Sequence, residues 1–225
     1  MALPTLEIPY FTTKLPSDKK QVTYRPFLVK EQKRIMLSEQ GEGEKVMLKN
    51  LASVLQACIQ ESDIDILTRP IVDFEHLFLA VRSKSIGESA ELVTNCDECK
   101  SPIEFELSLI EQTKPQPMPD SMLKLNDKLS LLFKPVSLQC LLNSNNDEDL
   151  ISNCIVSVFY NNETYTEFTK DEFLKFIEPL SAKEFNVIET FFQNQPKLCL
   201  EHTCKCLKCG KSKEVKLEGI FNFFQ

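Results

Sequence analysis

The chain has 225 residues, with 26 basic and 33 acidic side chains, a net charge of −7, nine cysteines and five glycines. A composition that is 42% hydrophobic and 26% charged is typical of globular proteins and excludes disordered and fibrous classes. The acidic excess disfavours nucleic-acid binding by the whole surface, and no stretch reaches the roughly 18 apolar residues of a membrane span.

The cysteine count and the first residues bear on the compartment. Nine cysteines cannot all close into disulfides within one chain. The first residues, MALPTLEIPYF, lack the basic segment and the apolar run of a signal peptide. We therefore expect synthesis in a reducing cytoplasm and no export by a signal of this kind.

The first 87 residues divide into an extended part and a helical part. Residues 1–26 hold four prolines and several β-forming residues, which predict an extended arm or hairpin. Residues 27–87 form a predicted helical region, with one helix from Phe27, a second in the middle and a third after Pro70. The second helix has apolar residues spaced mostly three or four apart, which indicates an amphipathic helix: Val46, Leu48, Leu51, Val54, Leu55, Cys58 and Ile59.

Residues 88–111 and 197–219 are predicted to form two β-hairpins, each around a Cys-x-x-Cys pair. In the first, Ile103 and Phe105 alternate with glutamates, and this period of two is typical of a half-buried strand. In the second, Gly210 follows the cysteine pair and suits a backbone position with positive φ. We interpret the two hairpins as the halves of one zinc-ribbon-like β domain.

Residues 112–196 lie between these halves and are predicted to form an inserted, α-rich domain. A proline-rich linker at 114–119 precedes a predicted strand over 128–135 and a helical stripe of apolar residues between 150 and 159. Two capping boxes, Thr169-x-x-Glu172 and Ser181-x-x-Glu184, predict two further helix starts. The aromatic stripes of these two helices are expected to face the core.

The predicted fold class is therefore α+β, with a helical N-terminal part and a helical insertion around a β element of two cysteine turns. Residues 220–225 end the chain as an aromatic tail, for which we favour a core-closing role over a docking role.

The two cysteine pairs are the candidate metal site. A structural zinc takes four ligands in a tetrahedron, and a Cys-x-x-Cys turn directs two thiolates at one metal. We predict one structural Zn²⁺ bound by Cys96, Cys99, Cys206 and Cys209. Between the pairs lie 106 residues, and closing that loop costs about 4–5 kcal/mol of chain entropy. An apparent binding free energy of about 10–16 kcal/mol for a structural zinc exceeds this cost.

Other interpretations of the cysteines stay open. Either Cys204 or His202, which lie near the second pair, could replace one of the four ligands. A thioredoxin-like redox pair also has the Cys-x-x-Cys spacing, but neither pair here opens a visible helix after a buried strand. The cysteines among apolar neighbours are expected to be buried thiols: Cys58, Cys140, Cys154 and Cys199.

A run of lysines surrounds the second pair: Lys205, Lys208, Lys211, Lys213 and Lys216. Zinc ribbons can bind nucleic acid, so this lysine run supports nucleic-acid binding as an alternative function. We favour a solvated face, or pairing with Glu104 and Glu106 of the other hairpin. No aromatic side chains interleave the lysines, as single-strand binding would require, so nucleic acid is an unlikely partner.

Few residues are candidates for catalysis. The chain has two histidines, and His76 falls inside the third predicted helix, where a core-edge or surface position is expected. It has no Gly-x-Ser-x-Gly elbow, no phosphate-binding loop and no His-x-Glu motif. A metal held by four thiolates also has no position left for water. We therefore predict that the protein is not an enzyme.

Four features together carry a resemblance to a known family. They are Tyr24-Arg-Pro-Phe-Leu-Val-Lys-Glu31, Phe78-x-x-x-Arg82-Ser-Lys-Ser85-x-Gly-Glu88, the two cysteine pairs, and the ending from Pro196-Lys-Leu198 to Gly219-Ile-Phe-Asn-Phe-Phe224. By their number and order, the chain resembles the baseplate hub proteins of T-even-type contractile-tailed phages over nearly its whole length. The resemblance implies a structural or assembly role at the centre of the tail baseplate, other hub proteins as partners, and no enzymatic activity.

The leading hypothesis is a non-enzymatic phage tail protein that is present in the host cytoplasm during assembly. Two alternatives stay open: it remains in the tail baseplate of the virion, or it acts only as an assembly factor. Self-association is a further expectation. The alternative hypothesis is a zinc-ribbon nucleic-acid-binding or transcription accessory protein that uses the lysine-rich turn.

Overall fold

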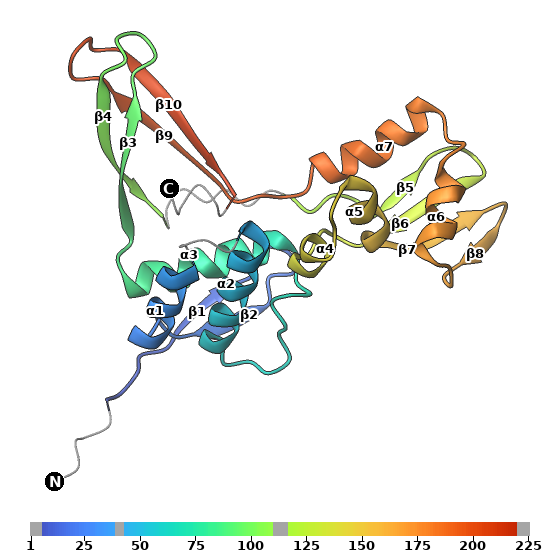
Figure 1. Cartoon of the computed structure of the whole chain (residues 1–225), viewed down its shortest axis with the longest axis horizontal. Coiled ribbons are helices and arrows are strands. Elements are labelled where there is room, and N and C mark those ends of the chain that lie inside the picture. The colour runs from blue at the N-terminus through green and yellow to red at the C-terminus, as the bar shows by residue number, and fades with distance from the viewer. Residues whose placement is uncertain (1–5, 39–42, 110–116, 220–225) are drawn as a thin grey trace. The chain divides into compact units, whose positions relative to one another are not determined.

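The structure is a computed structural model that describes residues 6–38, 43–109 and 117–219 and divides into two units (Figure 1). The described residues of the first unit fall within Met1–Ile66, Val72–Gln116 and Lys197–Gln225, and those of the second within Leu67–Ile71 and Pro117–Pro196. Helices accompany small antiparallel sheets in both units, so the predicted α+β class is confirmed. The aromatic tail at 220–225 lies outside the described residues, as does part of the predicted linker.

The first unit combines helices with three β-hairpins. Its elements in chain order are β1 (Phe11–Lys14), β2 (Gln21–Tyr24), α1 (Val29–Ser38), α2 (Glu44–Cys58), α3 (Ile71–Ser85), β3 (Ser89–Asn95), β4 (Pro102–Ser108), β9 (Cys199–Lys205) and β10 (Ser212–Glu218). Strands β1 and β2, β3 and β4, and β9 and β10 each form a two-stranded antiparallel sheet. The hairpin, the three helices and the two cysteine-bearing hairpins predicted for these segments are all present.

The helical part of the first unit encloses an apolar core. Helix α2 buries most of the stripe predicted from its spacing, from Leu48 to Cys58, and Leu51 and Leu55 are almost completely buried. Val46 is exposed, and Ile59 follows the end of the helix. Phe74 and Leu77 of α3 are also fully buried. The first hairpin joins the end of α2, because the Arg25 N–H donates to the Cys58 carbonyl over 3.0 Å.

Two of the motifs that carry the family resemblance contact one another. The Phe27 N–H donates to the Ser85 hydroxyl over 2.8 Å, and the Phe27 ring lies 6.1 Å from that of Phe78. Inside the first motif, the Arg25 guanidinium donates two hydrogen bonds to the Glu31 carboxylate, at 3.1 and 3.2 Å, and both side chains are buried. These motifs therefore have a structural role, since they join the first hairpin to α1 and α3.

The second unit packs helices on a four-stranded antiparallel sheet with the strand order β5-β6-β7-β8. Its elements in chain order are β5 (Met122–Lys124), β6 (Leu129–Phe133), α4 (Leu138–Leu142), α5 (Asp147–Cys154), β7 (Ile155–Tyr160), β8 (Glu163–Tyr165), α6 (Lys170–Ile177) and α7 (Ala182–Gln193). One apolar cluster joins the sheet to the helices and includes Leu131, Phe133, Phe173 and Ile188.

Both predicted capping boxes are confirmed. The Thr169 hydroxyl accepts from the Glu172 N–H at the start of α6, and the Ser181 hydroxyl accepts from the Glu184 N–H at the start of α7. In each case the glutamate side chain accepts the N–H of the capping residue in return. The aromatic stripes behind these caps supply Phe173 and other core residues of the second unit, as predicted.

The helical stripe predicted between 150 and 159 is wrong in its second half. Helix α5 ends at Cys154, and Ile155 begins strand β7. Residues 155–160 read Ile-Val-Ser-Val-Phe-Tyr, and these β-branched and aromatic side chains favour a strand that pairs with β6 on one side and β8 on the other. The segment predicted to be α-rich therefore holds four strands beside its four helices within the described residues. Its independent folding stays a prediction.

Candidate metal centre

The first cysteine pair lies in the tight turn between β3 and β4. The Cys96 N–H donates to the Ser101 carbonyl over 2.9 Å, and the Lys100 N–H donates to the Cys96 carbonyl over 3.0 Å. Lys100, directly after Cys99, has a φ of 56°, which is uncommon for a residue with a side chain. The turn thus wraps around the two sulfurs and returns the chain into β4.

The second pair repeats this turn between β9 and β10. The Cys206 N–H donates to the Lys211 carbonyl over 2.8 Å, and the Gly210 N–H donates to the Cys206 carbonyl over 2.9 Å. Gly210 has a φ of 73°, so the positive φ predicted at this glycine is confirmed. Two segments far apart in the sequence therefore present their cysteines in the same way.

The two turns bring the four predicted ligands together. The sulfur atoms of Cys96 and Cys209 lie 3.6 Å apart, as do those of Cys99 and Cys206. All four sulfurs lie within 4.8 Å of one another. Figure 1 shows the two hairpins meeting at their turn ends. No other group of three or more such ligands occurs among the residues that the structure describes.

The geometry of the cluster suits one tetrahedral metal ion. Zinc–sulfur bonds of about 2.3 Å in a tetrahedron place neighbouring sulfurs about 3.8 Å apart, close to the 3.6 Å contacts found here. Four thiolates are also a donor set typical of structural zinc sites. Cys96 and Cys206 are buried, whereas Cys209 is exposed, so an ion could reach the site from the Cys209 side.

The thiols of the cluster ionise unequally. The Cys99 N–H lowers the pKa of Cys96, and the Ser101 hydroxyl and N–H lower the pKa of Cys99 to about 6. The Lys211 N–H alone would lower the pKa of Cys209, but loss of solvation and the neighbouring sulfurs raise it to about 12. Sulfurs this close cannot all be negative without a cation among them. A divalent metal would displace the remaining protons.

Besides the sulfurs, a small apolar cluster and the Lys213 side chain join the two hairpins at this end. The apolar cluster holds buried Ile103 and partly buried Phe105 and Val215 beside the cysteines. The Lys213 ammonium forms an ion pair with Asp97 at 2.8 Å and thereby lowers the pKa of that carboxyl. A metal held by all four sulfurs would add a further link between the turns to these contacts.

The whole-chain comparison decides the family. Residues 8–225 match the family described as T4 bacteriophage base plate protein. The chain belongs to this family. Its membership confirms the resemblance to T4-type baseplate proteins and supports a structural role in the tail baseplate. Neither the search of curated proteins nor the search of solved structures returned a significant match.

This baseplate-family chain keeps both alternative ligands engaged elsewhere. The Cys204 thiol is buried and donates to the Lys213 carbonyl over 3.5 Å. The His202 ring stacks on Phe105, with 5.1 Å between ring centroids and 11° between planes. Neither side chain belongs to the cluster of four sulfurs. Strand alternation in the sequence could have indicated these positions. His202 and Cys204 are two residues apart in β9 and therefore lie on the same face of the strand, which faces the first hairpin.

The lysine run pairs with the first hairpin through a different carboxylate from the two that were expected. Glu104 and Glu106 alternate with buried Ile103 and Leu107 along β4, so their carboxylates lie on the outer face of that hairpin. The ion pair between the hairpins is instead the one from Lys213 to Asp97. Lys205, Lys208 and Lys211 are exposed around the second turn.

The remaining cysteines are buried thiols, as predicted for Cys58, Cys140, Cys154 and Cys199. Burial raises the pKa of Cys58 to about 11, which keeps that thiol protonated at neutral pH. Both Cys-x-x-Cys turns continue into strands, whereas a thioredoxin-like pair would open a helix. None of the helices in the described ranges is long and apolar enough to cross a membrane.

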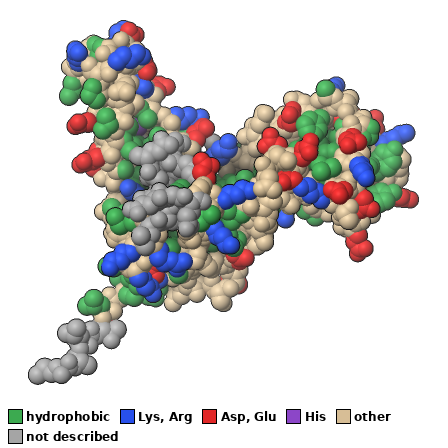
Figure 2. All heavy atoms as spheres, in the orientation of Figure 1, with side chains coloured by type: hydrophobic (Ala, Val, Ile, Leu, Met, Phe, Trp, Pro, Cys, Tyr) green, Lys and Arg blue, Asp and Glu red, His purple; other side chains and the backbone are tan. Residues whose placement is uncertain are grey.

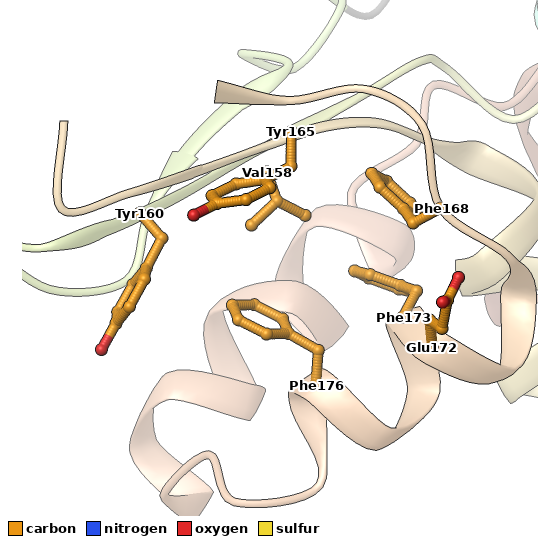
Figure 3. Close-up of a pocket in the computed structure, with 7 residues that line it drawn as sticks. All are labelled: Val158, Tyr160, Tyr165, Phe168, Glu172, Phe173 and Phe176. Carbon is orange, nitrogen blue, oxygen red and sulfur yellow. The ribbon is translucent and has the colours of Figure 1, made fainter. Parts of the chain in front are cut away.

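Sequence reasoning missed one further feature, an apolar groove in the second unit between β7, β8 and α6 (Figure 3). Because the helical stripe predicted between 150 and 159 includes the residues of β7, the sequence predicts no groove here. The hairpin of β7 and β8 could have been recognised from Asn161-Asn162, because these two residues, with φ angles of 51° and 68°, form its two-residue turn.

Proposed function

We propose that this baseplate-family protein is a structural component or assembly factor of the central hub of a phage tail baseplate. It acts through contacts with other hub proteins in the host cytoplasm during assembly, and as a structural component it would then stay in the tail. The observation that carries the proposal is the family match over residues 8–225. The motifs shared with hub proteins support the assignment to the hub.

The proposal includes one structural Zn²⁺ bound by Cys96, Cys99, Cys206 and Cys209. Their distances and the chemistry of the donor set support it. Zinc would tie the end of one hairpin to the end of the other across the inserted segment. Because four thiolates fill the tetrahedron, the metal would have no position for a substrate, and we infer a non-catalytic role.

Co-expression with hub proteins of the same phage tests this function. At moderate salt, the untagged chain should co-elute with them in size-exclusion chromatography. Charge reversal of the exposed turn lysines, in a Lys208→Glu, Lys211→Glu variant, should change this association less than about twofold. A wild-type chain that is folded and elutes alone in the presence of every hub protein would refute the hub assignment.

The same variant also tests the alternative function, which is nucleic-acid binding through the exposed lysines. That function predicts DNA binding that weakens steeply with salt and is lost in Lys208→Glu, Lys211→Glu. A matched control is Lys128→Glu, Lys183→Glu, which reverses two exposed charges of the second unit. Loss of DNA binding in the turn variant alone would favour the nucleic-acid function over the hub function.

A further inference from the structure

The second unit has an apolar groove where α6 lies beside the last two strands of the sheet (Figure 3). Its cavity of about 320 Å³ is at the lower end of the range of ligand pockets, large enough for one or two apolar side chains. Val158 and Phe173 are buried residues at its lining. The other lining residues are Glu172 and four aromatic residues: Tyr160, Tyr165, Phe168 and Phe176.

The walls of the groove are ordered by contacts with one another. The Tyr160 ring meets the Phe176 ring edge-on at 6.1 Å, and the Phe168 ring stacks on Phe173 at 5.9 Å. Even so, Tyr160 is 39% exposed and Tyr165 is 45% exposed. Large aromatic side chains gathered around an open apolar cavity are typical of interaction sites rather than of ordinary surface.

An open strand edge borders the groove. Strand β8 pairs with β7 on one side only, and it is the last strand of the sheet in the described part of the chain. All three of its residues are exposed. The backbone groups on the outer side of such a strand can pair with a strand from another chain.

The charge around the groove is strongly acidic. The second unit carries 12 acidic and seven basic side chains, so it holds −5 of the total charge of −7. Four of the acidic residues lie in the short stretch that forms β8 and the start of α6: Glu163, Glu167, Asp171 and Glu172. The one lysine in this stretch, Lys170, forms an ion pair with Asp149, and the next lysine of α6, Lys175, lies near Glu172, so the four carboxylates outnumber the two lysines. A ligand of this surface should therefore be cationic as well as apolar.

We propose that the groove and the β8 edge together bind an extended segment of a partner protein. The segment adds a strand beside β8 and places an aromatic side chain in the groove, with Lys or Arg on either side facing the acidic stretch. Main-chain hydrogen bonds then supply affinity and the groove supplies specificity. This inference deepens the proposed function and rests on it only where the partner is taken to be a hub protein.

A pair of short peptides tests the recognition chemistry. We would titrate the full chain into fluorescein-labelled Lys-Val-Phe-Val-Lys, with Glu-Val-Phe-Val-Glu as the matched control, and follow fluorescence anisotropy. In a strand, both lysines of the first peptide lie on the same side as its phenylalanine. The basic peptide should bind at least about tenfold more tightly than the acidic one, and this preference should shrink as salt rises. Equal affinities would overturn the proposal.

Variants at exposed positions locate the binding without disturbing the core. Tyr165→Ala should weaken binding of the basic peptide at least about fivefold. Glu163→Lys, Glu167→Lys should weaken the basic peptide and strengthen the acidic one. The matched control is Met122→Ala, because Met122 is 41% exposed on the opposite edge strand, β5. A similar effect of Tyr165→Ala and Met122→Ala would overturn the site.

Amide resonances separate strand addition from other modes of binding. In NMR spectra of the isotope-labelled chain, the basic peptide should shift the amides of β8 more than those of β5. Changes confined to β5, or to the first unit, would overturn the proposal. So would a concentration-dependent dimer that is lost in Tyr165→Ala and excludes the peptide, since a second copy would then be the occupant.

The hub complex distinguishes this inference from the function on which it rests. If the Tyr165→Ala variant binds neither the peptide nor the hub proteins, while Met122→Ala binds both, the groove is the contact with the hub. If Tyr165→Ala joins the complex like the wild type, the groove as hub contact is overturned and the hub function stands. If the wild type binds the peptide but joins no hub complex, the hub function fails and the groove stands.

Discussion

Removal of the proposed zinc should open the turn ends of the two hairpins while the helical core stays folded. A structural zinc contributes about 10–16 kcal/mol of apparent binding free energy, and closing the loop between the pairs opposes it by about 4–5 kcal/mol. The difference is at least about 5 kcal/mol, which corresponds to more than a thousandfold in an opening equilibrium. Without the metal, the turn ends keep the small apolar cluster and the Lys213 contacts, but each is a two-stranded hairpin, which is marginal in water.

The structure indicates where the opening should stop. The Leu198 N–H donates to the Glu75 carboxylate over 2.7 Å, which fixes the start of the second hairpin to α3. Hydrogen exchange followed by mass spectrometry should therefore show loss of protection near Cys96 and Cys206 after chelation under reducing conditions. Protection in α2 and in the second unit should not change. Unchanged exchange at both turns, in protein shown to have lost its metal, would refute the reasoning.

Three further predictions concern stability. Glu31→Gln breaks the buried pair with Arg25 and should lower the free energy of unfolding of the first unit by about 3–5 kcal/mol, measured by urea denaturation. Leu131→Ala, at a fully buried position of β6, should destabilise the second unit by about 2–5 kcal/mol in the same assay, and a loss below 1 kcal/mol would contradict the assigned core. Ser181→Ala removes the cap of α7 and should cost about 1 kcal/mol. The Ser181 hydroxyl lowers the pKa of Glu184 to about 2, so the stability due to this carboxylate is present above pH about 4.5 and lost as the pH falls toward 2. Ser181→Ala should therefore show a smaller loss over that range, and an identical pH profile would count against the capping box.

The sequence predicted the elements whose causes are local. Each capping box needs only a hydroxyl and a carboxylate three residues apart, and the stripe of α2 needs only its spacing. The cysteine turns are local in the same sense, and their pairing across 106 residues followed from the ligand number of zinc rather than from any pattern.

The features that sequence reasoning missed depend on tertiary pairing. The apolar residues between Leu150 and Phe159 fit a helical stripe. From Ile155 onward the chain is nevertheless a strand, because β7 pairs with β6 and β8. The direction of Glu104 likewise depends on which face of β4 meets the second hairpin. The apolar groove could not be predicted, because it forms only once Phe176 of α6 and Tyr160 of β7 lie side by side.

The metal content of the purified chain tests the central claim most directly. Elemental analysis of untagged protein, prepared under reducing conditions, should give about one zinc per chain. Cys206→Ser should lose that zinc, while Cys204→Ser, a matched change in the same strand region, should keep it. Protein without metal, or a Cys206→Ser variant that retains a full equivalent of zinc, would contradict the account.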